Sequence, residues 1–221
     1  MDLSLRITPA VPDAMANGRT LFLSASIPDP QRWAGEFDAL EITDAVVSLA
    51  RTFLTAGWRL VTAAHPTIAP LLLYVAAEMP GTEDGRVVIY QSDLFDDVLP
   101  TATRRFEADG VGPVIWTAAA DGDAPVPGEW DASLEVMRRQ MFSETDPAAA
   151  VFIGGMEGIS HEFQLFSQMM GGRATYPIGR PGGEARALAA ASSSGLRDLL
   201  IGGAVYPSLW RAVLSDLDAK Q

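Results

Sequence analysis

Glycines that follow an apolar run are the first residues in this chain that could do chemistry. The run 151–153 stops at Gly154 and Gly155, and the turn 154–158 leads into a helical pattern that carries Glu162. A glycine turn lets backbone approach a ligand closely, and the first amides of the following helix have no partner within it. Such amides bind anions. The segment therefore predicts the floor of a nucleotide-type pocket.

Small and polar residues also follow the other apolar runs of the sequence. In open parallel sheets, ligands bind outside the carboxyl ends of the strands, at a topological switch point, so we expect these residues to meet. Hydroxyls and free amides suit a ribose and a phosphate, and Arg180 is the candidate phosphate counterion. The candidate ligand-binding residues are Ser24, Ala25, Ser26, Arg32, Ala64, His65, Pro66, Thr67, Gln91, Gly154, Gly155, Met156, Glu157, Gly158, Glu162 and Arg180.

Each candidate also has a purely structural interpretation. Two successive glycines after a strand are often only a tight turn, and Arg32 and Arg180 could make surface contacts. Glu162 fits a solvated helix face as well as a ribose-binding carboxylate, while Glu157 could compete with a phosphate for amides. His65 has no Ser/Asp partners at a recognisable triad spacing. Neither histidine belongs to a metal-ligand motif, so we expect no metal and no cofactor.

The elements that must position these residues alternate between strands and helices. Near-continuous apolar runs predict strands at 20–26, 58–64, 86–92, 112–118, around 151–153 and at 173–179. Helical spacing predicts helices at 39–56, 68–78, near 96–108, 131–143, after the glycine turn, 184–201 and 206–219. Arg138 and Arg139 are expected to face water. This alternation predicts an α/β protein with a mostly parallel central sheet covered on both faces. Residues 1–19 are interpreted as an irregular lead-in and 20–221 as a single domain.

Composition narrows the function further. The chain has 221 residues, a net charge of −12, no cysteine and a single lysine, Lys220. Nucleic-acid binding draws its affinity from phosphate neutralisation. A surface this acidic therefore argues against a nucleic-acid partner. No apolar stretch approaches the roughly 20 residues that span a bilayer, and no secretory signal is visible, so we expect no membrane association and a cytoplasmic location.

Three segments together resemble the SLOG superfamily (the SMF/DprA–LOG grouping), over roughly residues 20–180. They are FLSAS at 22–26, TAAHPTIAPLLL at 62–73 and FIGGMEGISHEF at 152–163. The resemblance is closest to sensor-type SLOG domains of bacterial nucleotide signalling and defence. It implies a Rossmann-like three-layer α/β/α fold and a pocket for nucleotides or nucleotide-derived ligands such as ADP-ribose, cyclic ADP-ribose or NAD-like molecules. It also implies that the serines, the His65–Thr67 loop and the glycines with Glu162 line that pocket.

The same resemblance includes enzymes that cleave N-glycosidic bonds. The LOG phosphoribohydrolases carry a Pro-Gly-Gly-x-Gly-Thr-x-x-Glu motif, from which this chain departs: Ile153 replaces the proline, an extra residue separates the glycines, Ile159 replaces the threonine, and the Glu falls one place later. We therefore favour a ligand-binding domain without catalysis. The alternative is a LOG-like or nucleoside deoxyribosyltransferase-like enzyme with Glu162, or less favourably Glu157, as the catalytic group.

A third hypothesis, compatible with the first, concerns assembly. The last predicted helix carries a broad apolar stripe in which Trp210 and Leu214 lie beside the main row. We expect these side chains to form a homo-oligomer interface. An effector protein is a further partner on which the sequence gives no information.

Overall fold

The computed structural model describes residues 19–79, 85–126, 128–203 and 205–220. All of the expected lead-in except Arg19 lies outside these residues. Six strands form one sheet: β1 (Thr20–Ser26), β2 (Arg59–Ala63), β3 (Val87–Ser92), β4 (Val114–Thr117), β5 (Ala149–Gly154) and β6 (Ala174–Ile178). Their spatial order is β4-β3-β2-β1-β5-β6, and every neighbouring pair is parallel. The strand order reverses at β1, which places the topological switch point between β1 and β5.

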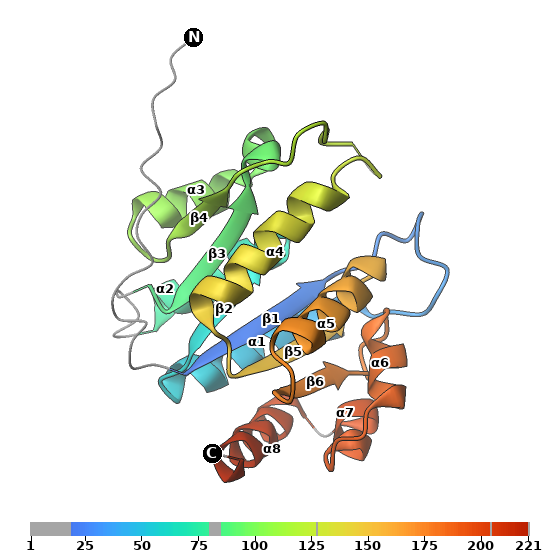
Figure 1. Cartoon of the computed structure of the whole chain (residues 1–221). Coiled ribbons are helices and arrows are strands. Elements are labelled where there is room, and N and C mark those ends of the chain that lie inside the picture. The colour runs from blue at the N-terminus through green and yellow to red at the C-terminus, as the bar shows by residue number, and fades with distance from the viewer. Residues whose placement is uncertain (1–18, 80–84, 127, 204, 221) are drawn as a thin grey trace.

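Helices cover both faces of the sheet (Figure 1). One face carries α1 (Ala39–Thr55), α2 (Ile68–Glu78), α3 (Thr101–Ala108) and α8 (Tyr206–Ala219). The other carries α4 (Asp131–Thr145) and α5 (Glu157–Met169), which lie in front of the sheet in Figure 1. The shorter α6 (Ala185–Ala191) and α7 (Arg197–Gly202) lie beside β6. This three-layer Rossmann-like α/β arrangement confirms the expected fold class.

The alternation of β1 explains how the sheet is buried on both sides and how the first serine is placed. Leu21 and Leu23 point into the core beneath α1 and α8, whereas Phe22 points into the core beneath α4 and α5. There the ring of Phe22 meets that of Phe142 edge to face, with centroids 4.7 Å apart. Because side chains alternate with a period of two, Ser24 follows Phe22 onto the α4/α5 face.

Two predicted helices are interrupted. The helix expected near 96–108 is a 3-10 helix, η2 (Asp93–Val98), followed by α3, and Pro100 separates them. Proline lacks the N–H that a continuous helix requires. The helix expected at 184–201 is divided into α6 and α7 by Ser192, Ser193, Ser194 and Gly195. Serine side chains compete for backbone groups, and Ser192 and Ser194 accept such bonds from the amides two residues ahead.

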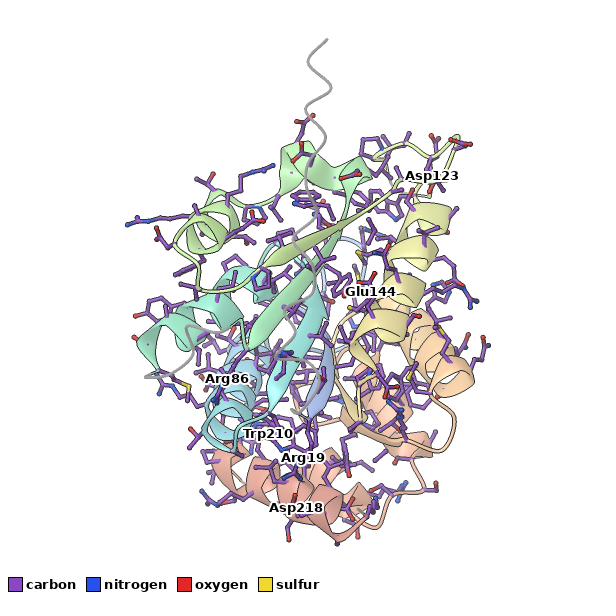
Figure 2. The ribbon with its side chains drawn as sticks, turned by 60° about the vertical axis from the view of Figure 1, so that its left-hand side comes forward. Arg19, Arg86, Asp123, Glu144, Trp210 and Asp218 are labelled. Carbon is purple, nitrogen blue, oxygen red and sulfur yellow. The ribbon has the colours of Figure 1, made fainter. Side chains whose placement is uncertain are left out.

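The closing helix α8 packs inside the chain. Trp210 is fully buried, and its indole N–H donates to the carbonyl of Ala45 on α1 at 3.1 Å. Near the same end of the sheet, Arg19 at the start of β1 pairs with Asp218 of α8, and Asp123 lies at the opposite end (Figure 2). The expectation that Trp210 forms an oligomer interface is therefore wrong, because α1 already covers it. Within the described residues, no helix is both long enough and apolar enough to cross a bilayer.

Candidate functional site

A cavity of about 560 Å³ lies at the carboxyl edge of the sheet, on the α4/α5 face. The ends of β1, β2 and β3 form its floor, and α4, the start of α5 and the segment after β3 form its walls. It is lined by Ser24, Ala25, Ser26, Arg32, Thr62, Ala63, Ala64, His65, Pro66, Gln91, Phe95, Val98, Pro125, Trp130, Leu134, Met137, Arg138, Met156, Glu157, Gly158, Ile159 and Glu162. This size is within the usual range for small-molecule sites.

Most of the candidate residues from the sequence meet at this cavity. The carboxyl ends of β1, β2 and β3 and the first turn of α5 bring together Ser24, Ala25, Ser26, Arg32, Ala64, His65, Pro66, Gln91, Met156, Glu157, Gly158 and Glu162. Thr67, Gly154, Gly155 and Arg180 are not among the lining residues. The strand exits therefore converge as the parallel-sheet rule anticipates, while four candidates have other positions.

Glu162 is held at the cavity by two side chains from other elements. Its Oε2 accepts a hydrogen bond from Ser24 Oγ at 2.5 Å, and its Oε1 accepts one from Arg138 Nε at 3.0 Å. Ser24 is 2 % exposed, and Glu162 and Arg138 are each 9 % exposed. Glu162 is therefore a buried, fixed carboxylate beside the cavity and does not lie on a solvated helix face.

Arg138 is the functional candidate that the sequence interpretation missed. It was expected to face water with Arg139, but only Arg139 does so, where it pairs with Glu135 on the same helix. Arg138 lies next to Met137 and one turn after Leu134, so the helical period places it at the border of the buried face. Among the described residues, its two Nη atoms have no hydrogen-bond partner, although its Nε is bound to Glu162. Arg138 thus keeps donors that a ligand could use.

The paired glycines shape the turn without lining the cavity. Gly154 and Gly155 have φ of +65° and +69°. The amide of Gly155 donates to the carbonyl of Ser26 at 2.8 Å, and a Cβ on Gly154 would lie 2.6 Å from that same oxygen. A Cβ on Gly183 would lie 2.5 Å from the backbone of Gly154. The glycines therefore allow the exits of β1, β5 and β6 to pack closely, and neither is among the residues that line the cavity.

His65 faces the cavity as a neutral imidazole. The amide and the hydroxyl of Thr67 approach its Nδ1 at 3.4 and 3.0 Å. Because a backbone N–H can only donate, Nδ1 is the acceptor and the ring proton is on Nε2. Burial lowers the pKa of His65, and the nearby Glu162 carboxylate opposes this shift only in part. Thr67 orients the His65 ring through these contacts and does not itself line the cavity.

The lowered pKa of His65 predicts a loss of stability in mild acid. The unfolded chain takes up this proton near pH 6.5 and the folded chain only at lower pH, so stability should fall as pH decreases below about 6.5. The slope for one proton is at most about 1.4 kcal/mol per pH unit. Urea unfolding between pH 7 and 5.5 should show a smaller decrease for His65→Gln than for the unmodified chain. His161→Gln, at an exposed position, is the control, and equal slopes in all three proteins would refute this prediction.

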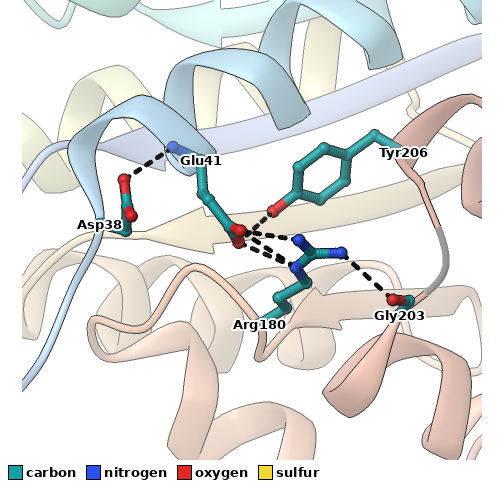
Figure 3. A network of polar contacts seen from close by, with 5 residues as sticks. All are labelled: Asp38, Glu41, Arg180, Gly203 and Tyr206. Atoms are coloured by element: carbon teal, nitrogen blue, oxygen red, sulfur yellow. Dashed lines mark hydrogen bonds and ion pairs between the residues drawn. The ribbon is translucent and has the colours of Figure 1, made fainter.

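Arg180 is not among the residues that line the cavity and is bound by other groups, so we no longer expect it to act as a phosphate counterion. Its Nη2 lies 2.7 Å from Glu41 Oε1 on α1, and its Nη1 donates to the carbonyl of Gly203 at 3.3 Å. Tyr206 also donates to Glu41, at 3.1 Å (Figure 3). The Arg180 guanidinium holds the pKa of the Glu41 carboxyl below its usual value. These contacts tie the β6–α6 loop to α1 and α8. Glu41 is therefore the counterion of the Arg180 guanidinium that was expected to bind a phosphate.

Removal of Arg180 should therefore affect stability and leave ligand binding unchanged. We expect Arg180→Ala to lower the urea midpoint, because Glu41 and the Gly203 carbonyl lose a shared donor. Arg51→Ala removes a more exposed, single-contact pair with Glu78 and should shift the midpoint less. A loss of ligand affinity in Arg180→Ala at a temperature where the variant is fully folded would contradict this placement.

The side chains of the site suit a small organic ligand better than a metal ion. Across the part of the chain that the structure describes, no group of three or more His, Asp or Glu side chains is arranged to hold a metal ion. The cavity instead combines hydroxyls, one carboxylate–guanidinium pair, a neutral imidazole and aromatic rings. This combination can bind a sugar and a planar ring.

The fold and the position of the cavity define the class: a Rossmann-like α/β protein with its candidate site beside the topological switch point. The model of the SLOG cluster3 family matches residues 32–214, and the chain belongs to this SLOG family. The match confirms the superfamily resemblance, begins after β1 and extends beyond residue 180. The X-ray structure of TM1055, a structural genomics target, is similar with a TM-score of 0.49 and 16 % identity, over 78 % of this chain and 81 % of that chain. None of the curated proteins matches the sequence.

Proposed function

We propose that this SLOG domain binds and senses a nucleotide-derived small molecule in the cavity at the carboxyl edge of its sheet. The candidates are ADP-ribose, cyclic ADP-ribose, an NAD-like molecule or a nucleoside phosphate, in the setting of bacterial nucleotide signalling or defence. The observation that carries this proposal is the convergence of the β1 serines, the start of α5 and the Glu162–Arg138 pair on one cavity.

The polar groups at the β1 side of the cavity suit a phosphorylated sugar. Ser26 has a hydroxyl without a hydrogen-bond partner among the described residues, and Arg138 has two spare nitrogens. Met156 precedes the first turn of α5 and makes no side-chain cap; the amide of Ile159 donates to the Met156 carbonyl at 2.9 Å, and the amides of Glu157 and Gly158 remain available. Hydrogen bonds to charged groups contribute roughly 1.5–3 kcal/mol each, so three of them at the upper end of this range approach the roughly 8 kcal/mol of micromolar binding.

Isothermal titration with ADP-ribose, cyclic ADP-ribose, NAD and AMP tests the proposal. We expect heat of binding for at least one of them. Ser26→Leu should abolish this heat because its larger side chain enters the cavity, whereas Ser215→Leu, on the exposed side of α8, should bind as the unmodified chain does. Absence of binding across the whole panel by folded protein would refute the proposal.

A second candidate is cleavage of an N-glycosidic bond. The specific observation in its favour is a carboxylate, Glu162, fixed at the cavity by Ser24 and Arg138. A carboxylate fixed beside a cation is suited to act as a nucleophile. Release of free base from AMP or NAD, abolished by Glu162→Gln, would establish it. If the unmodified chain releases no base from either substrate, binding alone remains.

A homo-oligomer and an effector-protein partner also remain proposals. Trp210 is buried and cannot form the interface expected of it, whereas Leu214 on the same helix is only partly buried. Light scattering with and without the ligand found by titration would separate constitutive assembly from ligand-driven assembly.

A further inference from the structure

Gln91 is a buried amide at the β3 end of the cavity. It is the second-last residue of β3, is 6 % exposed and lines the cavity wall. Its backbone carbonyl accepts from Thr117 Oγ1 at 3.5 Å, but its side-chain amide makes no hydrogen bond with any described residue. A carboxamide offers two donors and an acceptor, and leaving them unpaired in a protein interior costs free energy. The Gln91 amide is not among the fully buried side-chain groups that lack a partner, so its donors and acceptor are accessible from the cavity.

Two aromatic rings lie at the same end of the cavity. Phe95 follows β3 in η2, and Trp130 precedes α4; their ring centroids are 5.4 Å apart at an interplanar angle of 64°. Both rings line the cavity and are half-buried, and neighbouring Val98, also a lining residue, is 58 % exposed. A partly exposed aromatic and aliphatic surface beside a cavity is typical of a binding site.

Described residues on both sides of Trp130 are hydrogen-bonded to one another. The amide of Ser133 donates to Asp123 Oδ2 at 2.7 Å, and the amide of Ala120 donates to Ser133 Oγ at 2.9 Å. The amide of Leu134 donates to the Trp130 carbonyl at 3.1 Å. Asp123 is labelled at this end of the molecule in Figure 2. These bonds hold the connection as a wall of the cavity.

The two ends of the cavity therefore differ in chemistry. The β3 end has rings and a neutral amide, and the β1 end has serines, the charged pair and the start of α5. β2 separates the two strands, so Gln91 and Ser24 lie about 10 Å apart across the sheet, from two spacings of about 4.8 Å. A base would fit the β3 end, and a sugar phosphate would fit the β1 end.

We infer that the β3 end is a base-recognition subsite: Gln91 hydrogen-bonds the edge of a planar nitrogen heterocycle that stacks on Trp130 and Phe95. The inference rests on the proposed function and fixes the orientation of the ligand, with its sugar and phosphate toward Ser24 and α5. The edge must present a donor beside an acceptor, as the N6 and N7 positions of adenine do for a glutamine amide.

Titrations with AMP and with ribose 5-phosphate test the subsite separately from the site as a whole. AMP should bind at least about 10-fold more tightly than ribose 5-phosphate, as a stacked base contributes. Gln91→Leu and Trp130→Ala should each reduce AMP affinity by about 10-fold and leave ribose 5-phosphate affinity unchanged. Trp130→Phe should restore most of the AMP affinity, and Val126→Ala, in the same connection but outside the cavity, should change neither.

A stability readout distinguishes a recognition role from a structural one. Gln91→Leu should not lower the unfolding midpoint, because the Gln91 side-chain amide makes no hydrogen bond with any described residue and the two side chains are of similar size. Equal affinities of AMP and ribose 5-phosphate, or variants that weaken both ligands alike, would overturn the subsite and leave the proposed function standing. Binding of neither probe nor any nucleotide in the larger panel would refute the proposed function itself.

Discussion

Glu162→Ala is expected to lower the free energy of unfolding by about 3–5 kcal/mol, because it leaves the Arg138 guanidinium buried without its counterion. Both partners are only 9 % exposed, so water from the cavity can compensate for the lost carboxylate only in part. Ser24 would lose its acceptor at the same time. Urea unfolding at pH 7 measures the change directly.

The same helix provides the control for this prediction. Arg139 pairs with Glu135 at the surface of α4, and Glu135→Ala should cost at most about 0.5 kcal/mol. Replacing the buried pair together, as Arg138→Met with Glu162→Leu, should recover most of the stability, since apolar residues replace buried ion pairs without loss. If Glu162→Ala lowers the free energy of unfolding no more than Glu135→Ala does, the Arg138–Glu162 pair does not stabilise the fold as expected. Recovery by the double variant would indicate that the charges are kept for ligand binding.

Gly154→Ala is expected to destabilise the protein by about 3 kcal/mol or more. A left-handed backbone conformation costs a non-glycine residue roughly 1–2 kcal/mol, and the new Cβ would in addition lie 2.6 Å from both the Ser26 carbonyl oxygen and Ile42 Cδ1. Relief of this contact must move the exit of β1 away from β5. The variant should therefore lose ligand binding as well as stability.

Gly172→Ala separates the two causes. Gly172 also has a positive φ, +83°, but a Cβ there would meet no atom within 4 Å. It should show only the conformational cost of about 1–2 kcal/mol. Comparable destabilisation in both variants, measured by urea unfolding, would contradict the claim that Gly154 is required for close packing of the strand exits.

The strands and their order of appearance could be predicted because both faces of the sheet are buried. A run such as 20–26 must then be apolar almost throughout, which is a strong signal. Glu162 could be identified from its spacing after the glycine turn. Its partner Arg138 could not, because the meeting of α4 and α5 depends on how two helices pack across the sheet. Within α4 alone, the helical period places Arg138 at the border of the buried face but does not predict which residue it pairs with.

The loops account for the remaining differences. Arg180 follows β6 as expected, but the direction of its loop brings it to Glu41, far along the sequence, and no local pattern encodes that pairing. Phe95 and Trp130 reach the cavity from irregular segments whose course depends on bonds such as Ser133 to Asp123. Gly154 and Gly155 have the backbone freedom that the sequence implies, and they use it to pack against β1.

A crystal of the full chain soaked in a mixture of ADP-ribose, NAD and AMP is the most direct test of the central claim. We predict ligand density in the cavity at the carboxyl edge of β1, β2 and β3, with the sugar beside Ser24 and Arg138. Density confined to the separate groove along β6, beside Thr175 and Lys220, would contradict the claim, as would an empty cavity in crystals that diffract well after soaking.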